Sequence, residues 1–123
     1  MEPREGMSTR MPSGAADAHR LEAWTVEGDL LGSWEGAEAS AVLALVASLP
    51  TGEPARCFSP GYAIWAHTAD GQALFDLEFC FECFWVGVRE AGERQRLVAF
   101  DADSPPAQEL LARFEAFTST ELS

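Results

Sequence analysis

The sequence predicts an α+β fold, in which an antiparallel sheet, a three-strand meander with an added N-terminal hairpin, packs against two helices. Apolar and polar residues alternate along residues 62–68 and 74–88, which is typical of strands with one buried face. Residues 37–49 and 105–117 instead repeat apolar residues at intervals of three and four, which indicates amphipathic helices. Asp70-Gly71, between the two alternating segments, is a strong hairpin signal.

The composition suits one globular domain. The chain has 123 residues, of which 47% are hydrophobic and 23% charged. Residues 1–20 contain no apolar run of the kind found in signal peptides, so we expect a disordered leader followed by a single domain at residues 21–123. No stretch approaches the ~20 apolar residues of a membrane span. The sequence therefore predicts a cytoplasmic protein whose cysteines lie in a reducing compartment.

The charge balance restricts the class of partner. Twenty acidic residues stand against eight basic ones, all of them arginine, and the formal net charge is -12. A field of this sign repels phosphate backbones and anionic lipids, so neither nucleic-acid nor membrane binding is expected. It attracts a basic protein or a cation. The alternative is that the charge serves solubility alone.

The N-terminal elements follow from turn and breaker residues. Residues 23–26 and 30–34 have strand composition and flank the turn signal Glu27-Gly28-Asp29, which predicts a hairpin. The helix predicted at residues 37–49 ends before Pro50.

The strand that begins near Tyr62 should form a hairpin with the next strand. A two-residue type I′ loop at Asp70-Gly71 places Ile64 opposite Leu77 and Tyr62 opposite Phe79, so that both apolar rows share one face. The segment from Leu74 to Val88 is predicted to be one long central strand. Its odd positions, from Phe75 through Trp85, form an uninterrupted apolar row.

A second hairpin is predicted around Ala91-Gly92, with a returning strand at residues 94–100. Counting outward from a two-residue loop places Val98 opposite Trp85 and Phe100 opposite Cys83. The other face gathers apolar residues at one end, which the N-terminal hairpin or a partner would cover; these are Phe84, Val86, Leu97 and Ala99.

The C-terminal helix has a clear start and a clear apolar stripe. Asp103 or Ser104 is expected to cap it, ahead of prolines that the first turn tolerates. The stripe predicts a lid over the odd face of the sheet, and its residues are Leu110, Leu111, Phe114 and Phe117.

Cys80-Phe81-Glu82-Cys83 has the C-x-x-C spacing that zinc sites and thiol redox sites share. Because residues three apart on a regular strand point to opposite faces, Cys83 is expected in the core and Cys80 beside the carboxylates. A β-bulge at Glu82, which the change of apolar parity after it suggests, would bring both together with Cys57. Three interpretations stay open: structural cysteines, a metal site or disulfide that includes Cys57, and redox catalysis.

The same cysteines carry a resemblance. Cys57-Phe58-Ser59-Pro60, followed by the C-x-x-C segment, resembles a set of small uncharacterised bacterial proteins with the pattern C-F-x-P and then C-F-E-C. The resemblance covers residues 56–88, and the set has no established activity. A histidine often follows the proline by two residues in that set, which implies a zinc cluster of three cysteines and one histidine.

This chain departs from that pattern at Tyr62, which holds the position of the histidine. His67 is the other candidate, but register counting places it near Leu74, too far from Cys80 to share an ion. The alternative cofactor hypothesis is therefore zinc held by Cys57, Cys80 and Cys83.

The candidate binding residues lie on the polar face of the predicted sheet. Acidic and aromatic side chains on one face suit a basic protein surface, although the wet face of any antiparallel sheet is also polar. No catalytic motif accompanies the two histidines, so no enzyme is expected. The sequence favours a non-enzymatic acidic interaction protein of the bacterial cytoplasm, comparable to immunity proteins or chaperones. The residues expected to contact its basic partner are Trp65, His67, Asp76, Glu78 and Glu82.

Overall fold

A computed structural model describes residues 11–52, 61–81 and 85–119 of the chain. Six strands in these ranges form one antiparallel sheet in the order β2-β1-β3-β4-β5-β6, which confirms the α+β class and the N-terminal hairpin. In chain order the elements are the 3-10 helix η2 (Ser13–Asp17), β1 (Arg20–Thr25), β2 (Leu30–Glu35), α1 (Ala37–Ala47), β3 (Tyr62–His67), β4 (Ala73–Cys80), β5 (Trp85–Glu90), β6 (Arg96–Ala99) and α2 (Pro105–Ser119).

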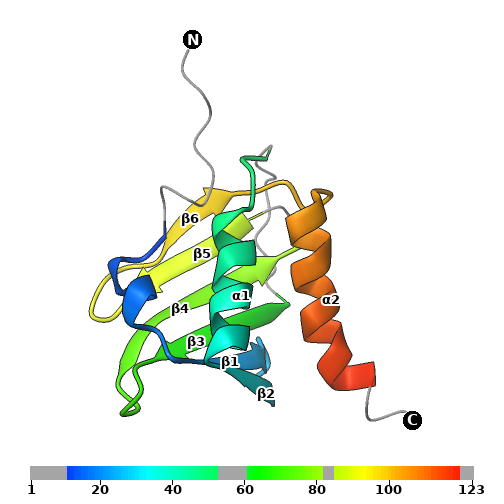
Figure 1. Cartoon of the computed structure of the whole chain (residues 1–123). Coiled ribbons are helices and arrows are strands. Elements are labelled where there is room, and N and C mark those ends of the chain that lie inside the picture. The colour runs from blue at the N-terminus through cyan, green and yellow to red at the C-terminus, as the bar shows by residue number, and fades with distance from the viewer. Residues whose placement is uncertain (1–10, 53–60, 82–84, 120–123) are drawn as a thin grey trace.

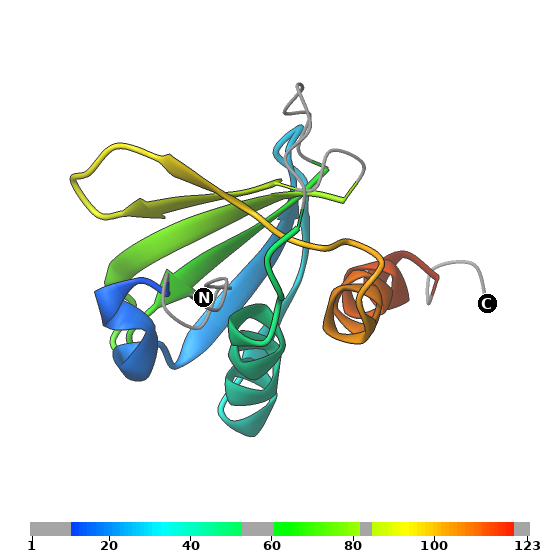
Figure 2. The ribbon, with the colours of Figure 1, turned by 90° about the horizontal axis from the view of Figure 1, so that it is seen from above.

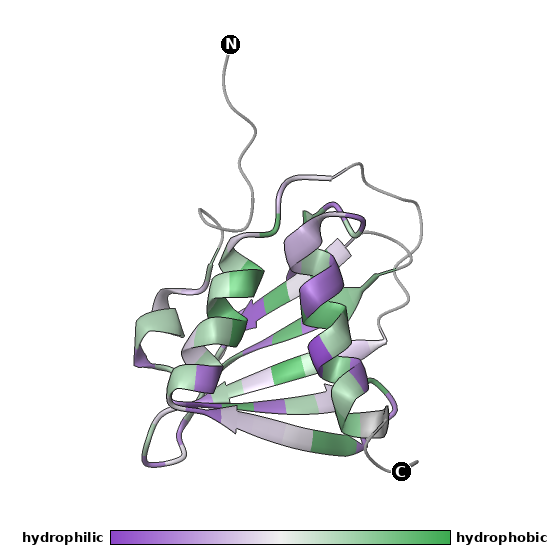
Figure 3. Cartoon of the chain, turned by 45° about the vertical axis from the view of Figure 1, so that its right-hand side comes forward, coloured by the Kyte–Doolittle hydropathy of each residue, from purple (hydrophilic) through white to green (hydrophobic). Residues whose placement is uncertain are grey.

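Both long helices lie on the same side of the sheet (Figures 1 and 2). The cause is the alternation of side chains along β4, whose residues Phe75, Leu77 and Phe79 are all buried against the helical layer. In α2, apolar bands alternate with hydrophilic ones, as expected for a helix with one buried stripe (Figure 3). Neither helix in the described part of the chain is long and apolar enough to cross a membrane.

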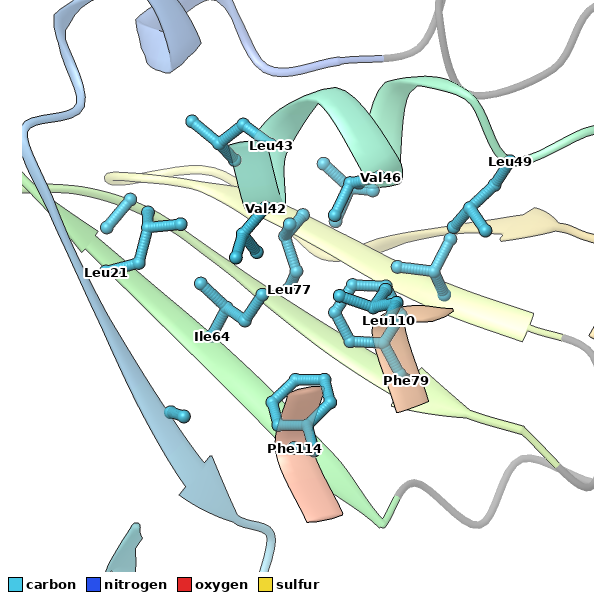
Figure 4. Packing of buried hydrophobic residues seen from close by; sticks show 14 of the residues in the cluster. Leu21, Val42, Leu43, Val46, Leu49, Ile64, Leu77, Phe79, Leu110 and Phe114 are labelled. Carbon is cyan, nitrogen blue, oxygen red and sulfur yellow. The ribbon is translucent and has the colours of Figure 1, made fainter. Parts of the chain in front are cut away.

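The core fills the space between the helices and the sheet. Val42 and Val46 of α1 lie over the strands that carry Ile64 and Leu77 (Figure 4). From α2, Phe114 reaches the other end of the same sheet face. Its ring stacks on Tyr62 with the centroids 4.6 Å apart and contacts the edges of Trp34 at 5.6 Å. The predicted lid over the odd face is therefore confirmed.

Both helix ends follow from local chemistry. Helix α1 ends two residues earlier than predicted, where the hydroxyl of Ser48 donates to the carbonyl of Ala44 at 2.7 Å. At the start of α2, the hydroxyl of Ser104 donates to the carbonyl of Asp101 at 2.6 Å, while the amide of Gln108 donates to the carbonyl of Ser104. Ser104 is thus the residue at which the helical hydrogen bonds begin.

The register of β3 against β4 is as predicted, with Ile64 opposite Leu77 and Tyr62 opposite Phe79. The loop itself differs from the prediction. The amide of Thr68 donates to the carbonyl of Gln72, which leaves three loop residues, and Gly71 adopts a positive φ of 91°. The register shifts by one residue between Ala66 and His67. This shift compensates for the extra loop residue, so the rest of β3 and β4 pair as predicted.

The single strand predicted from Leu74 to Val88 is wrong. The chain reverses within it, since β4 ends at Cys80, β5 begins at Trp85, and these two residues are paired neighbours. After the reversal the even positions face the helices, so Val86 and Val88 are core residues and not residues of the other face. The change of apolar parity that suggested a bulge therefore marks a hairpin.

The register of the last strand is shifted by one residue. Val98 lies opposite Val86 and not opposite Trp85, because the connection after β5 is one residue longer than the two-residue loop assumed. Gly92 in that connection has a positive φ of 79°. The expected pairing of Phe100 with Cys83 stays a prediction, because Cys83 lies outside the described residues.

The N-terminal part also differs from expectation. Folded structure begins before Leu21, because Met11 and Ala15 pack against the core and the hydroxyl of Ser13 donates to Glu90 at 2.8 Å. Residues 11–20 are therefore part of the domain. The hairpin of β1 and β2 extends the sheet beside β3 and does not cover the second sheet face.

The aromatic contact between α2 and the sheet gives a stability prediction. Phe114→Asp should abolish soluble expression, because it places an unpaired carboxylate in the core. Phe114→Ala should lower the free energy of unfolding by roughly 3–5 kcal/mol in urea denaturation. Ala116→Asp is the matched control, since that position on α2 is exposed and should change the stability by less than about 0.5 kcal/mol. A stable, soluble Phe114→Asp protein would contradict the placement of α2.

Candidate functional site

The sheet face opposite the helices carries the candidate site. We call it the open face, because no helix of the described residues lies over it (Figure 2). Strand pairing sets its members, which alternate with the core residues. They are Arg20, Glu22 and Trp24 of β1, Leu30, Ser33 and Glu35 of β2, Ala63, Trp65 and His67 of β3, Asp76, Glu78 and Cys80 of β4, Trp85, Gly87 and Arg89 of β5, and Leu97 and Ala99 of β6.

Tryptophan is concentrated on the open face. Three of the four tryptophans of the chain, Trp24, Trp65 and Trp85, belong to it, and only Trp34 lies in the core. Trp65 is 37% exposed and Leu97 is 45% exposed, which is unusual for side chains of this size. The open face is therefore apolar in part as well as polar.

An ion pair between a buried carboxylate and a half-exposed arginine lies at the centre of this face. Asp76 is only 4% exposed, and its Oδ2 accepts hydrogen bonds from Nη2 of Arg89 at 2.8 Å and from Nε of Arg89 at 3.0 Å. The same guanidinium lies 5.8 Å from the ring centroid of Trp65, within the range of a cation–π contact. Asp76 thus holds Arg89 beside Trp65.

The environment of Asp76 disfavours its ionised form. Burial raises the pKa of this carboxyl above its usual 3.8, although the hydrogen bond and the charge of Arg89 act in the opposite direction. The nearby charge of Glu78 raises the pKa further. The second oxygen, Oδ1, is buried and has no hydrogen-bond partner among the described residues.

Glu22 organises a second polar cluster, on β1. Its Oε1 accepts from the indole Nε1 of Trp24 at 3.3 Å and lies 3.3 Å from Nε2 of His67. Its Oε2 lies 3.2 Å from Nη2 of Arg20. These contacts fix the orientation of two rings on the open face.

Glu78 is held from the far edge of the sheet. Its Oε1 accepts from Nε2 of Gln95 at 2.8 Å. The Gln95 side chain crosses Gly87, where an added Cβ would lie 2.5 Å from Nε2 of Gln95. Glycine at position 87 therefore leaves the space through which Gln95 reaches Glu78.

The structure gathers most of the residues singled out from the sequence. Trp65, His67, Asp76 and Glu78 lie on the open face together, whereas Glu82 lies outside the described residues. Among the members that sequence reasoning missed are Glu22, Trp24, Trp85 and Arg89. The alternation of β1 was a usable signal for Glu22 and Trp24, but Arg89 joins Asp76 only through the unpredicted hairpin.

Of the three cysteines, one lies in the described part of the chain. Cys80 is buried at the end of β4, and Cys57 and Cys83 lie outside the described residues. His67 pairs with Ala73 at the opposite end of β4, roughly 20 Å from Cys80 at the usual rise of a strand. Within the described ranges, no three His, Cys, Asp or Glu side chains are grouped so that they could hold a metal ion.

Comparison with known proteins gives no match. No protein-family model, no curated protein and no solved structure matches the chain.

The raised pKa of Asp76 gives a testable pH dependence. The native state binds this proton more tightly than the unfolded chain, so ionisation of Asp76 should lower stability as the pH rises from 3.8 to the folded-state pKa. Urea unfolding of the wild type and of Asp76→Asn, compared pH by pH, isolates this contribution. Relative to the variant, the wild type should lose stability with rising pH across that window. A constant difference, or the opposite slope, would contradict the assignment.

Proposed function

We propose that the protein is a non-enzymatic interaction protein whose open face binds a basic protein partner. The observation that carries the proposal is the position of three tryptophans, with Arg89 held beside one of them, on a sheet face without a helical cover. Tryptophan and arginine are the residue types most enriched at the energetic centres of protein interfaces.

One row of the sheet shows why this face suits a protein surface. Trp24 pairs with Ala63, Ala63 with Glu78, and Glu78 with Gly87, so small residues alternate with large ones across four strands. Apolar Leu30 and Leu97 continue the row to the two outer strands, and each is about half exposed. A partner that covered this row would remove apolar area from water at roughly 25 cal/mol per Å².

The charge of the whole chain supports a basic partner. The formal net charge of -12 produces a long-range attraction that raises the association rate of a positively charged protein. On the open face itself two carboxylates are already paired with arginines, Asp76 with Arg89 and Glu22 with Arg20. We therefore assign attraction to the total charge and the close contacts to the tryptophans, His67 and Glu78.

A physiological role follows as part of the same proposal. A small acidic protein that covers a basic surface neutralises or protects it, which is what immunity proteins and chaperones of the bacterial cytoplasm do. The same negative field makes nucleic acid and anionic membrane unsuitable as partners.

The proposal predicts salt-sensitive binding. A basic protein captured from the native host and then purified should lose affinity at least about tenfold as ionic strength rises from about 0.1 M to about 1 M, because the Debye length shortens from about 10 Å to about 3 Å. Glu78→Lys should weaken binding at least about tenfold in calorimetry. Glu82→Lys should behave alike on the sequence argument.

Glu115→Lys provides the matched control for these charge reversals. It makes the same charge change on an exposed position of α2, in the helical layer, and should weaken binding much less than Glu78→Lys. Affinity that is insensitive to salt, or that falls equally in the two variants, would argue against the open face as the binding surface.

A second candidate function is a zinc or thiol module that uses Cys57, Cys80 and Cys83. One observation favours it: β4 ends at Cys80 and β5 begins at Trp85, so the regular strand assumed for the whole C-x-x-C segment does not extend past Cys80. The objection that a regular strand separates the two sulfurs therefore no longer applies. Paired thiolates near a tight connection are typical ligands of structural zinc.

Metal analysis distinguishes this candidate. Protein purified without chelators should contain about one zinc per chain, as expected for a closed structural site. Cys57→Ser, Cys80→Ser and Cys83→Ser should each lose it, because thiolates are the stronger zinc ligands. Substoichiometric zinc in the wild type, together with thiols that do not react with a disulfide reagent, would remove the whole class.

A further inference from the structure

A small cavity opens beside the Asp76–Arg89 pair. Its volume is about 180 Å³, and it lies beside the end of β3, at the start of β4 and the end of β5. Trp65 and Gly92 are among the residues that line it, and so are the charged residues Asp76, Arg89 and Glu90. The space is enough for one side chain of a partner and not for a large ligand.

The bonds between Asp76 and Arg89 leave one carboxylate oxygen and several guanidinium N–H groups that a ligand could use. Both N–H groups with which Arg89 contacts Asp76 lie against the same oxygen, Oδ2, so Oδ1 stays buried without a partner among the described residues. A buried acceptor without a donor is unfavourable, and a ligand that donates a hydrogen bond to it would recover that cost. The guanidinium has five N–H groups, of which these contacts use two, and its side chain is 45% exposed.

The charges around the cavity balance. Asp76 is paired with Arg89, and Glu90 accepts from Ser13 at 2.8 Å and lies 3.5 Å from Nη1 of Arg96. An added ammonium group would meet the guanidinium of Arg89, and an added carboxylate would meet the carboxylate of Asp76. The cavity therefore favours a neutral group that carries a donor and an acceptor side by side.

We propose that this cavity is the specificity subsite of the open face and receives a side-chain carboxamide, a glutamine or asparagine of the partner. The amide N–H donates to Oδ1 of Asp76, the amide carbonyl accepts from Arg89, and the methylene groups lie against Trp65. To reach Oδ1, the ligand shifts the long, half-exposed side chain of Arg89 slightly outward. The inference rests on the proposed protein partner, because it names the group through which that partner is recognised.

Small model compounds test the subsite without the partner. N-acetylglutamine methylamide is titrated into ¹⁵N-labelled protein and followed by amide shifts at residues 73–76 and 89–92 and by the indole N–H of Trp65. It should bind roughly tenfold more tightly than the glutamate and lysine analogues, the factor expected for one hydrogen bond to a charged group. Equal affinity for the three compounds, or shifts elsewhere on the protein, would overturn the proposal.

Two variants probe the two sides of the carboxamide. Arg89→Lys keeps the charge but loses the planar fork, and it should remove most of the preference for the glutamine compound. Asp76→Asn should have the same effect. If this substitution at a buried position prevents folding, the Arg89→Lys result alone decides the test. Arg113→Lys, the same exchange on α2, should leave the titration unchanged. A preference that survives Arg89→Lys would refute the subsite.

The outcomes separate this inference from the proposed function. If a basic partner loses affinity with Glu78→Lys but not with Arg89→Lys or Asp76→Asn, the interaction face stands and the carboxamide subsite is wrong. If the glutamine compound binds with the expected preference while no basic protein binds the open face, the subsite stands and the proposed function is wrong.

Discussion

The pleat of β4 is the constraint on which the rest of the structure depends. Phe75, Leu77 and Phe79 point to one side and draw both helices onto it, because only that side offers a continuous apolar surface. Asp76 and Glu78 point to the other side, where neither helix of the described chain lies. A shift of one residue would exchange the two rows, so the division into a covered face and an open face is set by this strand alone.

The reversal after Cys80 decides what the open face contains. It returns the chain beside β4, so Arg89 lies opposite Asp76, and Trp85 leaves the apolar row in which the sequence placed it. A straight strand would have carried both residues far from Asp76. The sequence does contain a signal of the reversal, because the apolar positions change parity after Glu82. A single β-bulge would produce the same change of parity, however, and no glycine, proline or asparagine there indicates a turn.

The sequence predicted the class, the helices and the central register for physical reasons. Both the alternation of apolar residues and the Asp70-Gly71 turn predict that Tyr62 pairs with Phe79. The loop is one residue longer than predicted, but this pairing is unchanged because the register shifts by one residue next to His67. Of the site, Trp65, His67, Asp76 and Glu78 follow from alternation alone. Arg89 does not, because its contact with Asp76 depends on the position of a turn that local composition does not fix.

Composition also gives an incomplete account of the charge. A net charge of -12 describes the field at a distance, but on the open face the carboxylates of Asp76 and Glu22 are bonded to arginines of the same sheet. A partner that replaced these bonds would have to break ion pairs that already exist, which brings little net gain. In the proposed complex, the field would govern how fast a basic partner arrives. Which partner stays bound would depend on the tryptophans and on Oδ1 of Asp76, a buried carboxylate oxygen that the described fold leaves without a donor.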